Sequence, residues 1–75
     1  MFDQKDLLKL ARMEMPFGKY RGRALIDLPE EYLLWFQRKG LPEGQLGQLL
    51  ALALELHVNG LADMVKPLKR AKEKS

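Results

Sequence analysis

The segment "GQLGQLLALALELHVN" in the second half of the chain most constrains the fold, because it is apolar on nearly every side of a helix. Most of the helix circumference is taken by Leu46, Leu49, Leu50, Leu52, Ala53, Leu54 and Leu56. A clear polar strip is limited to Gln45, Gln48, Glu55 and Asn59. Such a helix must be central in its fold or covered by a second chain. Two arrangements therefore stay open: a central helix clasped by its neighbours, and a homodimer interface.

The length of the chain makes this constraint sharper. A chain of 75 residues forms one small domain and buries only about 60% of the surface that it exposes when unfolded. It has no cysteine, so neither a disulfide nor a thiolate metal site can reinforce it. The helical core must pack efficiently, or a partner must complete it.

Two other segments have clear helical signals. Asp3 can cap a first helix, whose apolar stripe runs to about Met13. "DLPEEYLLWFQRKG" predicts a second helix with Pro29 in its first turn, acidic residues at its start, basic residues at its end, and a stop at Gly40. The leucine-rich helix should then run to Gly60, and a short helix should cover residues 61–65.

Between the first two helices the helical spacing disappears. Pro16 biases Met15 toward an extended conformation, and Gly18 and Gly22 are typical turn residues. We therefore expect a β-hairpin with strands near 15–17 and 23–26 and a loop over 18–22. The predicted fold class is α+β, a short β-hairpin packed against three or four helices. Residues 1–68 would form the compact domain, and residues 69–75 a basic flexible tail.

Three aromatic residues share one face of the second predicted helix. Tyr32, Trp35 and Phe36 follow the i, i+3, i+4 spacing that is typical of a core anchor. We therefore expect Trp35 to be largely buried against the hairpin and the long helix. The alternative is an exposed Trp35 that acts as a platform for base stacking.

The loop "GKYRGR" is the best candidate for a binding site. Its cations could neutralise phosphates, and Tyr20 could stack a base or support the loop. The glycines leave backbone amides accessible to a phosphate. If the strand continues through the loop, Lys19, Arg21 and Arg23 lie on one side and Tyr20 on the other. The candidate nucleic-acid-binding residues are Gly18, Lys19, Tyr20, Arg21, Gly22 and Arg23. The competing interpretation is a solvated hairpin.

Catalytic chemistry has little support in the sequence. The chain has no threonine or cysteine, and its one serine is Ser75, so the usual nucleophiles are scarce. His57 has no second group placed beside it by sequence, and we expect it at a helix end or on the surface. The acids Asp27, Glu30 and Glu31 are explained by the positive end of a helix. We therefore expect no enzyme activity, no cofactor and no metal.

The charge is distributed unevenly along the chain. The net charge is +3, yet residues 24–65 carry two cations and six anions, so the excess positive charge lies in the loop and in the tail from residue 66. Such local clusters favour nonspecific nucleic-acid affinity. The start lacks the pattern of a secretory signal, and no run reaches the roughly 18 apolar residues of a membrane span. We expect a cytoplasmic bacterial protein.

Residues from Met15 to about Leu68 resemble a family of short bacterial proteins catalogued as putative quorum-sensing-regulated virulence factors. The most specific parts are "FGKYRGR" and "DLPEEYLLWF". The pattern also resembles the small C-terminal module of exodeoxyribonuclease X-type exonucleases. The matching positions are Gly18, Lys19, Tyr20, Arg21 and Gly22, followed by Asp27, Pro29, Tyr32 and Trp35. In those enzymes the catalytic acids belong to a separate nuclease domain.

The resemblance to the exonuclease module implies an accessory module that contacts DNA and does not catalyse. Together with the loop it predicts a small nucleic-acid-binding domain, whose partner would be single-stranded or structured DNA. The alternative is a protein-interaction or homodimerisation module that uses the leucine-rich helix, linked to quorum sensing or virulence.

Overall fold

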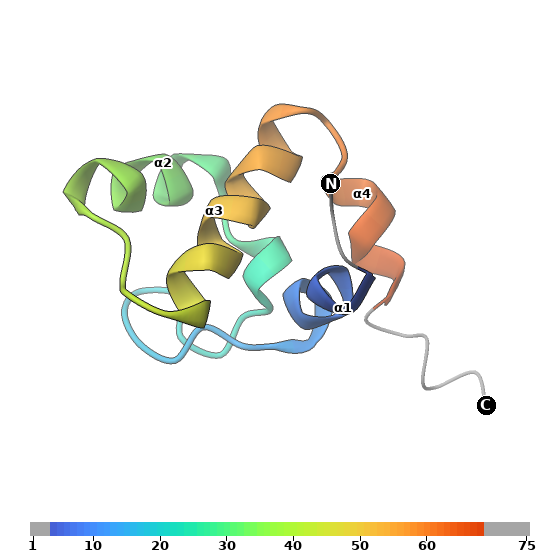
Figure 1. Cartoon of the computed structure of the whole chain (residues 1–75), viewed down its shortest axis with the longest axis horizontal. Helices are drawn as coiled ribbons and strands as arrows, with labels where there is room; N and C mark the ends of the chain where they lie inside the picture. Colours follow the sequence, from blue (N-terminus) through green and yellow to red (C-terminus); the bar gives the residue numbers. More distant parts are fainter. Residues whose placement is uncertain (1–3, 69–75) are drawn as a thin grey trace.

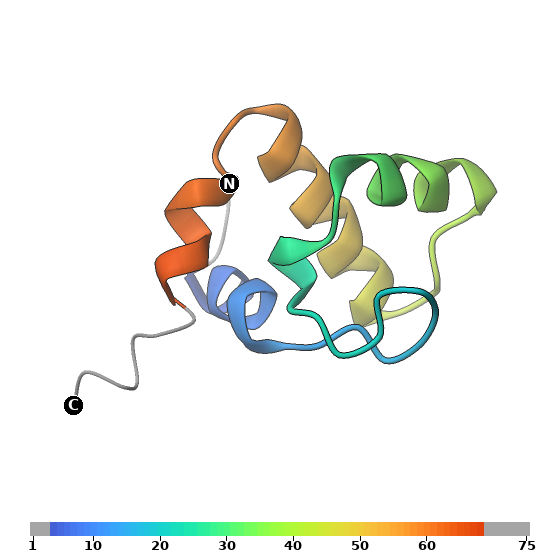
Figure 2. The same cartoon turned by 180° about the vertical axis from the view of Figure 1, so that it is seen from behind.

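The computed structural model describes residues 4–68, and every regular element within them is helical. In chain order these elements are the α-helix α1 (Gln4–Arg12), the 3-10 helix η1 (Leu25–Asp27), and the α-helices α2 (Glu30–Lys39), α3 (Gln45–Val58) and α4 (Ala62–Val65). Figure 1 shows α3 through the middle of the molecule, with α2 at one end and α1 and α4 at the other. Figure 2 shows the molecule from behind, where η1 lies between α1 and α3 and packs against both.

The predicted α+β class is wrong, because no β-hairpin forms in the described residues. One antiparallel bridge joins Glu14 to Ala24, and the next residues turn at once into η1. Four successive turn residues, 19–22, separate the two sides, so the backbone never stays extended long enough to form a ladder. The segment is a closed loop with one bridge at its base.

The central position of α3 answers the question posed by its sequence. The residues of α3 that the domain buries are Gly47, Leu49, Leu50, Ala53, Leu54 and Leu56. They meet apolar side chains of every other element, the largest of which are Leu10, Leu25, Ile26, Leu33 and Val65. Leu52 is half-buried, so the leucines of α3 form no exposed apolar strip. The interpretation as a central helix is confirmed, whereas the homodimer stays a prediction.

The boundaries of α2 follow the predicted signals. Pro29 caps the helix in an extended conformation, and Glu30 and Glu31 lie in the first turn, where carboxylates favour the positive end. Gly40 follows the last residue, and its N–H donates to the carbonyl oxygen of Phe36 at 3.0 Å.

A close crossing fixes the link between α2 and α3. Gly47 lies on α3 directly under the linker, and a Cβ at this position would overlap the carbonyl oxygen of Pro42. Only glycine therefore permits the linker to cross α3 at this distance, which positions α2 over the start of α3.

Two predictions fall on residues outside the described range, and a third is not tested by the structure. The cap at Asp3 and the tail at 69–75 are outside this range, and the cytoplasmic location stays a prediction. The helices between residues 4 and 68 are all too short or too polar to cross a membrane.

Candidate nucleic-acid interface

The loop that carries the predicted site is held closed by its own backbone. The N–H of Met15 donates to the carbonyl oxygen of Arg23 at 2.8 Å, and the N–H of Gly22 donates to that of Met15 at 2.9 Å. Gly18 and Gly22 have φ angles of 85° and 92°, a region that other residues enter only with strain. The sequence folds here into a tight turn whose six candidate residues, 18–23, lie together.

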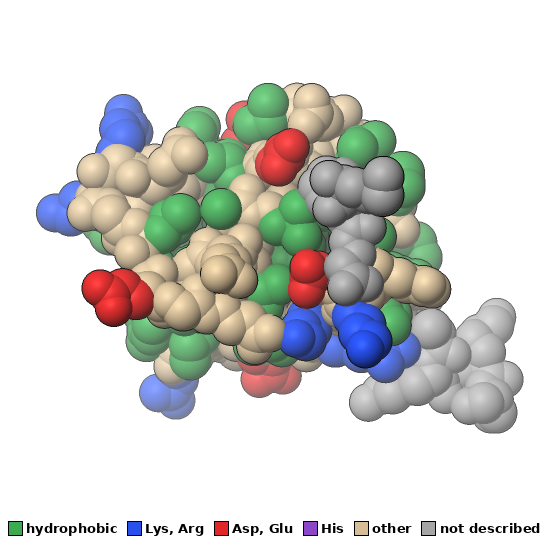
Figure 3. Space-filling model, viewed as in Figure 1, with side chains coloured by type: hydrophobic (Ala, Val, Ile, Leu, Met, Phe, Trp, Pro, Cys, Tyr) green, Lys and Arg blue, Asp and Glu red, His purple; other side chains and the backbone are tan. Residues whose placement is uncertain are grey.

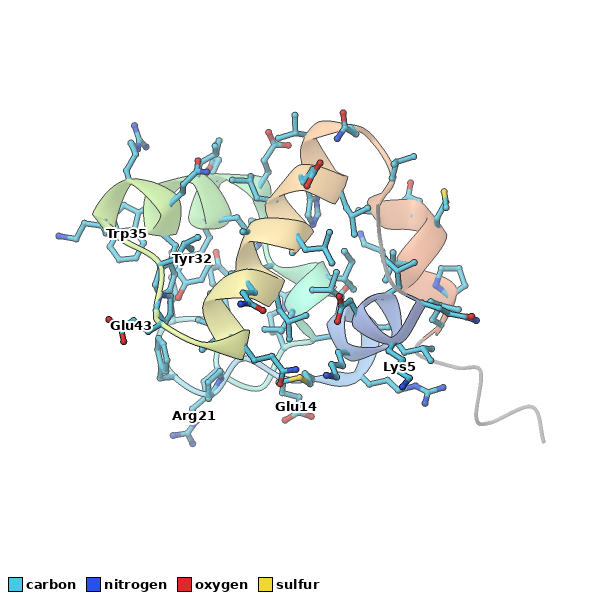
Figure 4. The ribbon with its side chains drawn as sticks, in the orientation of Figure 1. Lys5, Glu14, Arg21, Tyr32, Trp35 and Glu43 are labelled. Atoms are coloured by element: carbon cyan, nitrogen blue, oxygen red, sulfur yellow. The ribbon has the colours of Figure 1, made fainter. Side chains whose placement is uncertain are left out.

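The cations of the loop do not alternate as a strand would place them. Lys19 Nζ lies 5.5 Å and Arg23 Cζ 5.6 Å from the centre of the Tyr20 ring, so both cations gather on this aromatic side chain. Arg21 extends from the loop away from the body of the domain (Figure 4). All three cations are exposed. The turn thus replaces the predicted one-sided arrangement with a basic rim around Tyr20.

A cluster of five aromatic rings supports this loop. Tyr20 meets Tyr32 edge-on with ring centres 4.8 Å apart, and Phe17 lies 6.2 Å from Phe36. Along α2, Tyr32 and Trp35 are nearly parallel, with an angle of 16° and 5.9 Å between centres. Such contacts are worth about 0.5–1.5 kcal/mol each beyond their buried area. The rings therefore hold the loop against α2, and Tyr20 has a supporting role.

The prediction that Trp35 is largely buried is wrong. Trp35 is 46% exposed, whereas Leu33, two residues earlier, is 1% exposed. Successive residues turn by about 100° on a helix, so Leu33 points at the core, Phe36 and Tyr32 lie at the boundary, and Trp35 lies on the outside. The helix has an aromatic face, as predicted, but only one edge of that face meets the core.

Phe17 and Trp35 border an apolar groove between the loop and α2. The groove has a volume of about 380 Å³ and is lined by Phe17, Gly18, Lys19, Tyr32, Trp35 and Phe36. Phe17 is 44% exposed, so both flanking rings present area to solvent. Figure 4 shows Tyr32 and Trp35 projecting from α2 toward the loop.

Gly18 allows the loop to approach α2 at this groove. A Cβ on Gly18 would lie 3.0 Å from the hydroxyl oxygen of Tyr32, which is a tight contact. Its φ angle and this contact both favour glycine. The groove therefore depends on the same residue that begins the basic turn.

One lysine lines the groove, and a second lies over the Trp35 ring. Lys19 lines the groove from the loop, and Lys39 Nζ lies 5.9 Å from the centre of the Trp35 ring at the end of α2. Figure 3 shows basic side chains around the α2 end of the molecule and a second group over α1. Glu43, in the linker after α2, lies on the same side of the view as Trp35 in Figure 4. The site combines exposed aromatic rings with basic side chains.

Sequence reasoning placed the six loop residues together and raised Trp35 only as an alternative platform for base stacking, but it missed Phe17 and Lys39 as parts of the site. Phe17 directly precedes Gly18, and Lys39 lies four residues after Trp35, which is one helical turn. That spacing was the available signal for a cation beside an exposed ring. We did not use this spacing, because we interpreted the aromatic face of the helix as a core anchor.

The other polar candidates have structural roles. His57 lies in the last turn of α3, and its Nε2–H donates to the carbonyl oxygen of Ile26 at 2.9 Å, which ties α3 to η1. Within residues 4–68, no three His, Asp or Glu side chains are grouped as a metal site requires. The acids of the α2 start therefore do not converge with others on one point.

The chain has close relatives of unknown function. A family model described as "Putative quorum-sensing-regulated virulence factor" matches residues 3–68. The uncharacterised protein YpeB of Escherichia coli strain K12 is 54% identical over 69 residues, which cover 91% of this chain and 96% of that protein. YpeB of Escherichia coli O157:H7 matches equally well. No solved structure matches the chain.

Proposed function

We propose that this chain, which belongs to the family described as putative quorum-sensing-regulated virulence factors, binds nucleic acid through the basic loop of residues 18–23. The observation that carries the proposal is the gathering of Lys19, Arg21 and Arg23 on one rigid, exposed turn. Cations that neutralise phosphates release condensed counterions, which is the main source of sequence-independent affinity. The resemblance of "GKYRG" to the exonuclease module supports DNA as the first ligand to test.

The rigidity of the turn supports the proposal energetically. Ordering a flexible loop on binding costs free energy, and this cost is small when the bound shape exists beforehand. Two backbone hydrogen bonds to Met15 and the packing of Tyr20 on Tyr32 fix the loop before any ligand arrives. On binding, only the side chains of the three cations would need to change conformation.

The alternative, a protein-interaction module built on the leucine-rich helix, has no observation in its favour. Leu49, Leu50 and Leu56 are already buried by the domain itself. The proposal assigns no catalytic step to the chain. A link with quorum sensing or virulence comes only from the description of the family.

The test is fluorescence anisotropy of a labelled DNA oligonucleotide across a salt series. With three phosphates neutralised, the logarithm of the association constant should fall against the logarithm of salt with a slope of about −2 for a single strand. Replacing Lys19→Ala together with Arg21→Ala should flatten the slope to about −0.7 and weaken binding. Because both side chains are exposed, the melting curve should change little.

A matched control removes two charges elsewhere. Lys5 on α1 and Lys66 after α4 lie at the opposite end of the molecule from α2, and Lys5→Ala with Lys66→Ala lowers the net charge equally. This control should keep most of the slope. Undetectable wild-type binding at low salt, or equal losses in the two double variants, would contradict the proposal.

A further inference from the structure

We infer that the groove between Phe17 and Trp35 holds an unpaired base, so that the chain selects single-stranded over double-stranded nucleic acid. This inference rests on the proposed function and adds the class of ligand that the site recognises. It starts from two rings that the fold leaves about half exposed, although both belong to a tightly packed aromatic cluster.

The two rings are preorganised for stacking. Trp35 packs on Tyr32, which is nearly parallel to it, and on Phe36, which meets it edge-on at 5.6 Å. Phe17 packs on Phe36, with 6.2 Å between the ring centres. A base that enters meets aromatic surfaces whose orientation is already fixed. Stacking on such a ring typically contributes about five- to 150-fold in affinity.

The charges around the groove identify the occupant as an anionic strand. Lys19 lines the groove and Lys39 Nζ lies over the Trp35 ring, so the phosphates of a strand bound here would lie near two cations. A cationic ligand, which aromatic clusters also bind, would be repelled by the same two lysines. A proline-rich peptide would fill an aromatic groove but would leave both lysines without a counterpart.

An unpaired base is required by the geometry of stacking. In a duplex the faces of each base are covered by its neighbours, and only the base edges are open in the grooves. A base can stack on the exposed part of these rings only after it has left the stack of the duplex. The basic loop can bind either form of DNA, whereas the groove contributes only to single strands.

Trp35 is the one tryptophan of the chain, so its fluorescence reports on the groove directly. Unlabelled oligothymidylate should quench this fluorescence and saturate at the concentration where anisotropy saturates. A blunt hairpin duplex should bind through the loop with little quenching. Because this readout uses the wild-type protein, it does not depend on any variant folding.

Variants separate the groove from the loop. Trp35→Leu should weaken binding of the labelled single strand about ten-fold, weaken duplex binding much less, and keep the salt slope, since no charge is lost. Phe17→Leu should act in the same direction, which provides a second variant if Trp35→Leu folds poorly. Met64→Ala, at an apolar position that is 65% exposed and outside the groove, is the matched control and should bind like the wild type.

The outcomes distinguish the two proposals. Salt-dependent binding with no quenching, or with equal quenching by single strand and duplex, would overturn the groove inference and leave the proposed function standing. No binding of either DNA at low salt would overturn both. Quenching by a proline-rich peptide but not by oligothymidylate would identify the groove as a peptide site and would also overturn the inference.

Discussion

The two ends of this domain use apolar residues in opposite ways. At the end formed by α1, α4 and the second half of α3, the aliphatic side chains interlock, and Leu10, Leu56 and Val65 are 0–1% exposed. At the end formed by α2 and the loop of residues 16–23, five aromatic rings pack on one another, yet Phe17 and Trp35 stay about half exposed. The aliphatic end closes the core, whereas the aromatic end leaves surface available.

The difference shows how a small domain can separate stability from binding. Branched aliphatic side chains fill the interior and leave little apolar surface for a ligand. Aromatic rings are large enough to be anchored by one part and exposed by another. Cations over Tyr20 and Trp35 add positive charge beside this exposed apolar area. The aromatic end is therefore both a clamp for the loop and the candidate site.

The largest expected effect is on the free energy of unfolding. Truncating one residue at each end should show that the aliphatic end contributes more to it. Leu50→Ala removes a side chain that is 1% exposed and should cost about 2–5 kcal/mol, enough to unfold a marginal domain. Trp35→Ala removes a larger side chain but only half of it is buried, so it should cost about 2 kcal/mol or less.

Circular dichroism melting measures both variants under one set of conditions. One kcal/mol corresponds to about 4–8 °C in a domain of this size. A Trp35→Ala variant that unfolds as completely as Leu50→Ala would erase the distinction between the two ends.

A smaller loss of stability is expected when the glycines of the loop are replaced. These variants test which contacts within the aromatic end set the shape of the groove. Gly22→Ala meets open space and should cost only the strain of its positive φ, about 1–2 kcal/mol. Gly18→Ala adds a tight contact with the Tyr32 hydroxyl, so it should also shift the ring that borders the groove. Melting curves should therefore place the two variants close together, while Trp35 fluorescence changes more in Gly18→Ala. Identical spectra would show that Gly18 does not set the shape of the groove.

The helices were largely predictable because their signals are local. Pro29, the acids after it and Gly40 define α2 within the sequence itself. The end of α3 was predicted two residues late, since Asn59 and Gly60 belong to the turn that follows Val58. The central position of α3 followed from its nearly uniform apolar surface, although sequence alone left a second chain as the alternative.

The loop and the site were only partly predictable, because they depend on contacts between distant residues. Pro16 and the two glycines indicated a reversal of the chain, but they did not show that Tyr20 would pack on Tyr32 across to α2. The spacing of the aromatic residues on α2 identified a shared face. It could not specify that Leu33 would meet the core and leave Trp35 outside.

The location of the binding surface is tested most directly by nuclear magnetic resonance. Titrating the isotope-labelled protein with oligothymidylate should shift the amide signals of residues 17–23 and the indole N–H of Trp35, while signals of α4 stay nearly constant. The shifts should diminish as salt is raised. Shifts concentrated around Val58 and Met64, the exposed apolar residues at the other end, would contradict the account, as would an unmoved Trp35 indole at saturation.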